Sequence, residues 1–128
     1  MTERRRIKGP SPFEAKIRFS RAIRVGDRVL VSGTAPVWED GSVDPDPEAQ
    51  ARRCIEIIET ALREAGASLA DVVRTRQFIV DPADAEAVGR AHAAAFGEAR
   101  PASTMVVVAQ LLDPRWRVEI EAEAIVGD

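Results

Sequence analysis

The stretch Val118-Glu119-Ile120-Glu121-Ala122-Glu123-Ala124 alternates strictly between apolar residues and glutamates. Side chains on a β-strand point to opposite faces in turn, so this pattern predicts a strand over 117–126 with one apolar face and one face of carboxylates. The stretch just before it, Pro101-Ala102-Ser103-Thr104-Met105-Val106-Val107-Val108-Ala109, joins two hydroxyl residues to a run of valines. We expect a strand over 105–111 there, separated from the last strand by the Asp113-Pro114 turn.

The rest of the chain supplies the partners of these two strands. The patterns predict a hairpin with strands over 19–25 and 28–32, a helix over 46–65, a strand over 72–80 and a helix over 84–96. Asp46-Pro47-Glu48 places an acceptor, a proline and an acid where a helix begins, and Gly66 follows where it ends. The order β-β-α-β-α-β-β predicts an α+β domain with two helices on one face of the sheet.

Cys54 and His92 both fall within the apolar stripes of the expected helices. A cysteine in such a stripe is either a small buried hydrophobe or a nucleophile, and no neighbouring base favours the second reading. A histidine among alanines is either a packed core residue or a catalytic one. The apolar spacing favours the structural interpretation for both residues.

Length and composition limit the function classes that remain. We treat the 128 residues as a single domain, with residues 1–12 as a flexible tail that carries no secretory signal pattern. A net charge of −3 gives no general attraction to nucleic acid, and no apolar run reaches the roughly 20 residues that span a membrane. One cysteine and one histidine predict no disulfide, no Cys/His metal site and a reducing, cytoplasmic setting.

Two helices cover only one face of a five-stranded sheet, so the other face needs an explanation. Arg74, Arg76 and Phe78 lie on that face by alternation, as do the three glutamates of the last strand. The glutamates are either a solvated edge or a partly buried row paired with the arginines, and the matching spacing favours pairing. We expect Glu121 or Glu123 to pair with Arg74 or Arg76, and the face to pack against another subunit.

Few residues are left that could carry chemistry. The sequence contains no glycine-rich phosphate loop, no cluster of metal ligands and no nucleophilic triad. Hydroxyl residues end the expected strands at Ser32, Thr34, Ser103 and Thr104, and Glu119 is an acid beside them. A carboxylate in a partly desolvated cleft can deprotonate or orient a water molecule. The residues alone therefore indicate a small-molecule-binding oligomeric domain.

The chain resembles the reactive-intermediate deaminase superfamily, also called the YjgF or Rid family and described as endoribonuclease L-PSP-like, from Phe13 to Val126. The motifs that carry the resemblance are Phe19-Ser20-Arg21-Ala22-Ile23-Arg24-Val25-Gly26, Val31-Ser32-Gly33-Thr34, Ala65-Gly66-Ala67-Ser68-Leu69-Ala70-Asp71-Val72-Val73-Arg74-Thr75, Arg100-Pro101-Ala102-Ser103-Thr104 and Val118-Glu119-Ile120-Glu121-Ala122. The resemblance implies a chorismate-mutase-like fold. It also implies a homotrimer whose sheets form a central barrel, with ligand clefts between subunits and no cofactor.

The best-known branch of that family hydrolyses enamines and imines to 2-keto acids and ammonia. The glutamate that activates water there matches Glu119, and the serine matches Ser32. The family's tyrosine is Phe19 in this chain, and its carboxylate-binding arginine is Ser103. Arg18, Arg74, Arg76 and Arg100 are the arginines that could replace it.

The resemblance leaves three functions open. The first is a hydrolase of a small imine-like or amide-like substrate, in which Ser32, Ser103 and Thr104 bind and Phe19 and Trp38 wall the cleft. The second is a non-catalytic trimer that binds a small ligand or stabilises a partner. The third, ribonuclease or translation inhibitor, is disfavoured by the acidic charge and by the lack of base-stacking residues.

Overall fold

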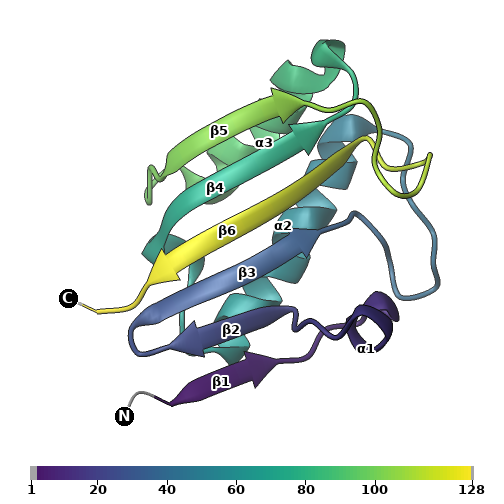
Figure 1. Ribbon diagram of the computed structural model, residues 1–128. Coiled ribbons are helices and arrows are strands. Elements are labelled where there is room, and N and C mark those ends of the chain that lie inside the picture. The colour runs from purple at the N-terminus through teal and green to yellow at the C-terminus, as the bar shows by residue number, and fades with distance from the viewer. Residues whose placement is uncertain (1–2, 128) are drawn as a thin grey trace.

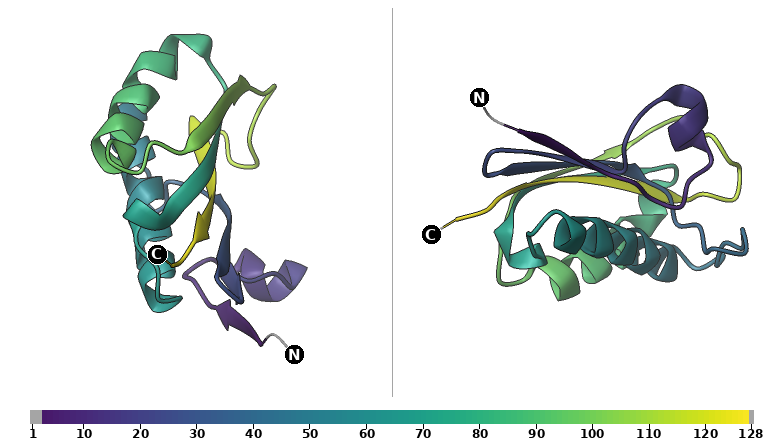
Figure 2. Two further views of the ribbon diagram at one scale, coloured as in Figure 1. Left: turned by 90° about the vertical axis from the view of Figure 1, so that its left-hand side faces the viewer. Right: turned by 90° about the horizontal axis from the view of Figure 1, so that it is seen from below.

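In the computed structural model, which describes residues 3–127, two helices cover one face of a six-stranded sheet (Figures 1 and 2). The strands are β1 (Arg4–Ile7), β2 (Ala22–Val25), β3 (Arg28–Thr34), β4 (Val72–Ile79), β5 (Ala102–Val107) and β6 (Val118–Ile125). The helices are α1 (Phe13–Ile17), α2 (Pro47–Glu64) and α3 (Ala85–Phe96), with 3-10 turns at Leu69–Asp71 and Pro82–Asp84. The predicted α+β class, with α2 and α3 on one face, is confirmed.

Strand β6 lies at the centre of the sheet, whose order is β1-β2-β3-β6-β4-β5. It pairs antiparallel with both β3 and β4, whereas β4 and β5 run parallel. The apolar residues of β6 are buried beneath the helices, namely Val118, Ile120, Ala122 and Ala124. The alternation seen in the sequence therefore places the glutamates on the opposite, uncovered face.

Helix α2 begins and ends at the residues that the sequence indicates. The Asp46 carboxylate accepts a hydrogen bond from the Ala49 N–H at 2.9 Å, and Pro47 is the first helical residue. Gly66 adopts a φ of +82°, a left-handed conformation that glycine tolerates and that ends the helix. The buried face of α2 includes Cys54, whose thiol pKa is raised mainly by burial, as expected for an unreactive core cysteine.

The predicted flexible tail is wrong for residues 4–7, which form β1 and pair antiparallel with β2. Ile7 is buried, and Arg5 donates to the Glu64 carbonyl at the end of α2. Three consecutive arginines hide the alternation of this strand, because Arg4 and Arg6 face one way and Arg5 the other. Met1 and Thr2, which belong to the same prediction, lie outside the described residues.

Two predicted strand boundaries are also wrong. The strand expected over 105–111 runs from Ala102 to Val107, because β5 follows β4 in parallel register from Arg74 to Ile79. The first hairpin strand starts at Ala22 rather than Phe19. Pairing with β4 therefore brings Ser103 and Thr104 into the strand, whereas the sequence placed them at its end.

The uncovered face of the sheet carries ion pairs, as predicted. Arg76 donates to Glu121 at 2.9 Å and lies 3.6 Å from Glu123, so the hypothesis of an arginine–glutamate pair is confirmed. In Figure 2, right, both long helices lie on the other side of the sheet. Exposed aliphatic side chains, including Leu30 and Val106, share this face with the charges.

Arg21 is a buried cation at the end of the sheet where β2 begins. It is 5% exposed and donates to the Gly33 carbonyl at 2.8 Å and to Thr34 Oγ1 at 2.9 Å. Its Nε lies 3.5 Å from the carboxylate of Glu14, which also accepts from the backbone N–H of Gly9 at 2.7 Å. Burial lowers the pKa of Arg21, and the Glu14 charge opposes that effect. Arg21 thus ties α1 to the end of β3.

Replacing Arg21 by methionine should lower the free energy of unfolding by about 3 kcal/mol, because Glu14 is left buried without its counter-charge. Urea unfolding would measure the change. The control is Arg52→Met on the exposed side of α2, where loss of the Glu48 pair should cost less than about 1 kcal/mol. Equal losses in the two variants would contradict the assigned role of Arg21.

Candidate functional site

The uncovered face of the sheet contains a cleft of about 440 Å³ beside β2, β3 and β6. This volume lies within the range typical of small-molecule sites. The lining residues are Arg6, Arg18, Phe19, Ser20, Ile23, Leu30, Val31, Ser32, Arg76, Glu121, Ala122 and Glu123. We call this the sheet-face cleft. It includes Phe19 and Ser32 of the residues predicted for the site.

Ser32 lies at an irregularity of β3. The register against β6 shifts between Val31 and Thr34, so an extra residue is accommodated in β3 at this point. The Ser32 hydroxyl donates to the Ser20 carbonyl at 2.7 Å, which leaves its lone pairs free to accept a hydrogen bond. The bulge therefore holds a hydroxyl group at the wall of the cleft.

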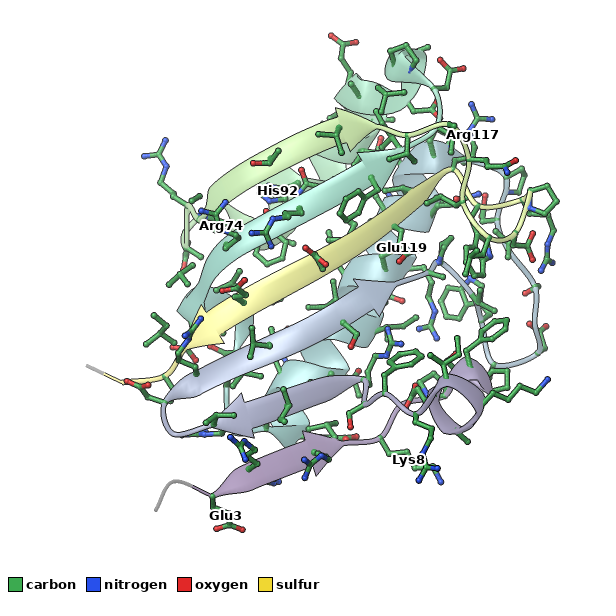
Figure 3. The ribbon with its side chains drawn as sticks, in the orientation of Figure 1. Glu3, Lys8, Arg74, His92, Arg117 and Glu119 are labelled. Atoms are coloured by element: carbon green, nitrogen blue, oxygen red, sulfur yellow. The ribbon has the colours of Figure 1, made fainter. Side chains whose placement is uncertain are left out.

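Glu119 lies on the uncovered face of β6, opposite Phe78 of β4 (Figure 3). Its carboxylate rests against Gly33, where a Cβ atom would collide with Oε2. Burial raises the pKa of Glu119, Glu121 raises it further, and the charge of Arg21 opposes both. A half-buried carboxyl with a raised pKa is suited to accept a proton from water. Gly33, which follows Ser32, leaves the space that the Glu119 carboxylate occupies.

Ser103 and Thr104 are neighbours on β5 and so point to opposite faces. Thr104 is in register with Arg76 and shares the uncovered face with Glu119. Ser103 is in register with Thr75 and lies on the face of α3, where its hydroxyl bonds the Thr75 hydroxyl at 2.9 Å. Within one chain, the structure therefore does not bring Ser103 together with Glu119.

Ser103 belongs to a closed polar network beneath α3. Gln77 donates to Thr75 Oγ1 at 2.9 Å, Thr75 donates to Ser103, and Ser103 donates to Gln77 Oε1 at 3.2 Å. His92 Nε2 lies 2.7 Å from the same Thr75 oxygen and donates to it, because the Thr75 proton is already used. Burial lowers the pKa of His92, and its ring packs against Phe96. These contacts agree with a structural histidine.

Trp38 lies in the loop before α2, under the guanidinium of Arg53 at 4.1 Å from the ring centroid. Arg53 also donates to the Val37 carbonyl, so one side chain of α2 contacts both the indole and the loop that carries it. Trp38 is not among the residues that line the sheet-face cleft.

The sequence did not predict that Arg6 lines the cleft, and it left Arg18 as one of several possible ligand-binding arginines. Arg6 was assigned to the tail, and Arg18 was one of four arginines named as replacements. Both line the cleft together with Phe19. The only signal for Arg6 was the alternation of residues 4–7, which three arginines obscure.

Two classes of site are missing from the part of the chain that the structure describes. Residues 3–127 contain no group of three histidine, cysteine or acidic residues that could hold a metal ion. No helix within this range is long and apolar enough to cross a membrane.

Comparison with known proteins identifies the family. The family model described as endoribonuclease L-PSP matches residues 10–126. A crystal structure from Mycobacterium tuberculosis, of a protein in the YjgF/YER057c/UK114 family, is 44% identical and superimposes with a TM-score of 0.89, over 97% of this chain and 100% of the other. This chain belongs to the YjgF/Rid family.

Two further relatives show how the family varies. A protein of Streptomyces coelicolor that is named only as uncharacterized is 37% identical over 96% of this chain and 92% of its own. The Salmonella typhimurium protein named 2-iminobutanoate/2-iminopropanoate deaminase is 35% identical over 84% of this chain and 86% of its own. The resemblance read from the motifs is therefore confirmed at the level of family and fold.

Replacing Glu119 by glutamine should raise stability at neutral pH, in a manner that depends on pH. Because the folded-state pKa of Glu119 is raised, the folded protein holds this proton more tightly than the unfolded chain, whose pKa is about 4.3. The stability of the wild type relative to Glu119→Gln should therefore fall as pH rises from the unfolded-state pKa to the higher folded-state pKa. Above the folded-state pKa the difference in stability should stay level. Urea unfolding between acidic and neutral pH measures this.

The control is Glu59→Gln on α2, which removes a carboxylate paired with Arg63 at the surface. It should show no such gain in stability with rising pH. A Glu119→Gln difference that does not change with pH would contradict the raised pKa.

Proposed function

We propose that this protein is a homotrimeric, cofactor-free hydrolase of small imines or enamines, with Glu119 activating water. The observation that carries the proposal is the half-buried Glu119 carboxyl, with its raised pKa, held against Gly33 on the uncovered face. Family membership and relatives named 2-iminobutanoate/2-iminopropanoate deaminase support the same chemistry. The proposal includes a cytoplasmic location, because a chain with a single cysteine forms no internal disulfide and suits a reducing compartment.

In the proposed reaction, Glu119 takes a proton from water while the water oxygen adds to the carbon of the C=N bond. Glu119 passes this proton to the nitrogen, which gives a tetrahedral carbinolamine. Glu119 then takes the proton of the new hydroxyl group and passes it to the nitrogen, so that the C=O bond forms as the C–N bond breaks. The products are a carbonyl compound and ammonia, and Glu119 ends in its starting state. An enamine first takes a proton on carbon to become the imine. General-base catalysis of this kind typically contributes 10²–10⁴-fold to a rate.

The uncovered sheet face supports the proposed trimer. Exposed Leu30 and Val106 share it with partly buried ion pairs, a mixture typical of surfaces that pack against another copy. Strand β5 also ends the sheet with an unpaired edge rich in exposed valine. A cleft shared between copies would add Thr104 of one chain to Phe19 and Ser32 of the next.

Ser103 supports the second candidate, a non-catalytic trimer that binds a small ligand or stabilises a partner. The deaminase branch has an arginine at this position, and a charged hydrogen bond contributes roughly 1.5–3 kcal/mol. At about 1.4 kcal/mol per factor of ten, its loss corresponds to one or more orders of magnitude in affinity for a carboxylate. This second candidate requires that no other arginine supplies the positive charge that Ser103 lacks.

Hydrolysis of 2-iminobutanoate and 2-iminopropanoate, followed by ammonia release, separates the two candidates. The wild type should turn over at least one imine, and Glu119→Gln should lower kcat by about 100-fold or more. Glu98→Gln, an exposed acid after α3, is the control and should leave kcat unchanged. Activity that survives Glu119→Gln would overturn the proposal. Turnover seen only after Ser103→Arg would favour the non-catalytic role.

Sedimentation velocity tests the trimer by itself. The wild type should sediment with three times the chain mass of 13.9 kDa. Val106→Lys places a charge on the uncovered face and should shift the protein towards monomers. Leu112→Lys, at a site that is 84% exposed in the single chain, should not. A monomeric wild type would remove the shared cleft from the proposal.

A further inference from the structure

The carboxylate of Glu119 is placed by its surroundings and not by hydrogen bonds of its own. Within residues 3–127 it accepts no hydrogen bond, so its lone pairs remain available to a water molecule. It rests in the space that Gly33 leaves, where a Cβ atom would collide with Oε2. The position of the carboxylate therefore depends on the backbone of Gly33.

Arg21 fixes that part of the backbone from inside the protein. Its Nη1 donates to the Gly33 carbonyl at 2.8 Å and to Thr34 Oγ1 at 2.9 Å. Thr34 is buried, and its hydroxyl donates in turn to the Ser32 carbonyl at 2.8 Å. These bonds hold the irregular end of β3, where the register against β6 shifts. One guanidinium thus holds the residue against which Glu119 rests.

Few charges act on Glu119. Burial raises the pKa of Glu119, the charge of Arg21 lowers it, and the charge of Glu121 raises it. Glu121 is itself paired with Arg76 of β4 at 2.9 Å. Burial also raises the pKa of the Cys54 thiol of α2, which therefore stays uncharged. Within residues 3–127, Arg21 is thus the group that opposes the effect of burial on Glu119.

We propose that Arg21 is a positioning residue for the hydrolysis, because it holds the backbone on which the Glu119 carboxylate rests and supplies the positive charge that favours its ionised form. Arg21 is buried, so it acts through Gly33 and Glu119 and not on the substrate itself. This inference rests on the proposed function, because it assigns Arg21 a part in the reaction attributed to Glu119.

The ion pair of Arg21 with Glu14 gives a matched pair of variants, because it can be broken from either end. Glu14→Gln breaks the pair and leaves the positive charge in place, whereas Arg21→Met breaks the pair and removes that charge. If Arg21 only ties α1 to β3, the two variants should have the same pH dependence of activity. If Arg21 acts on Glu119, only Arg21→Met should change it.

Hydrolysis of 2-iminobutanoate by the full chain, measured from acidic to mildly alkaline pH, tests the proposal. Glu119 acts in its ionised form, so kcat/KM should rise with pH through the pKa of Glu119. Loss of the Arg21 charge raises that pKa, so in Arg21→Met the rise should move to higher pH by roughly one unit. In Glu14→Gln the rise should not move to higher pH. Titration of the substrate is common to all variants and cancels in the comparison.

Two further variants separate loss of the charge from loss of folding. Glu14→Gln/Arg21→Met removes both ions of the buried pair, so it should be more stable than Arg21→Met and show the same shift to higher pH. Arg21→Lys keeps the charge and should keep the pH dependence of the wild type. A wild-type pH dependence in the double variant would overturn the proposal, and so would a shift in Glu14→Gln equal to that in Arg21→Met.

Gly33→Ala tests the contact between Gly33 and Glu119. The new Cβ meets the far end of a flexible side chain, so the Glu119 carboxylate should move while the fold persists. The expected result is a kcat about 100-fold lower, with an unfolding midpoint close to that of the wild type. The control is Gly89→Ala on α3, where an added Cβ has nothing within 4 Å and should leave kcat unchanged. An unchanged kcat in Gly33→Ala would overturn the role of this contact.

Nuclear magnetic resonance of the side-chain carboxyl carbons gives a readout that does not need turnover. The Glu119 signal, assigned by its loss in Glu119→Gln, should titrate at higher pH in Arg21→Met than in the wild type. That result in a protein that hydrolyses no imine would leave the effect of Arg21 on Glu119 standing and overturn the hydrolase. Hydrolysis that requires Glu119 but has one pH dependence with and without Arg21 would overturn this inference while the hydrolase stands.

Discussion

The buried guanidinium of Arg21 is the constraint on which the arrangement of the site depends. A cation in the interior needs several partners, and Arg21 finds them in Glu14 and at the end of β3, in Gly33 and Thr34. These contacts place α1, and with it the Arg18–Phe19 segment, beside the bulge of β3. The same charge acts on Glu119 and limits the rise of its pKa. One buried cation thus positions the wall of the cleft and also acts on the charge of Glu119.

The sheet separates two sets of polar residues that are neighbours in the sequence. Ser103 enters a network with Thr75, Gln77 and His92 beneath α3, whereas Thr104 shares the uncovered face with Glu119. The network satisfies the buried side chains of Thr75 and Gln77 and links them to His92 of α3. The Ser103 hydroxyl therefore bonds to residues of β4 on the side of the sheet that α3 covers.

The sheet-face cleft is built from distant parts of the chain. The edge strand β1 and the end of α1 bring Arg6 and Arg18 to the cleft, next to the hydroxyl of Ser32. Glu121 and Glu123 of β6 share the guanidinium of Arg76, and these ion pairs link β6 to β4.

The sequence by itself determined the elements whose patterns are local. The alternation of 118–124 predicted β6 and its two faces, and Asp46-Pro47 and Gly66 predicted the ends of α2. Matched spacing predicted that Glu121 or Glu123 pairs with Arg74 or Arg76, and the structure selects Arg76 and Glu121. These succeed because side-chain period and capping depend only on nearby residues. The tertiary structure alone decided that residues 4–7 form β1, that β5 starts at Ala102, and that Arg6 and Arg18 share a cleft. Strand pairing and register depend on the partner strand, which no local pattern specifies.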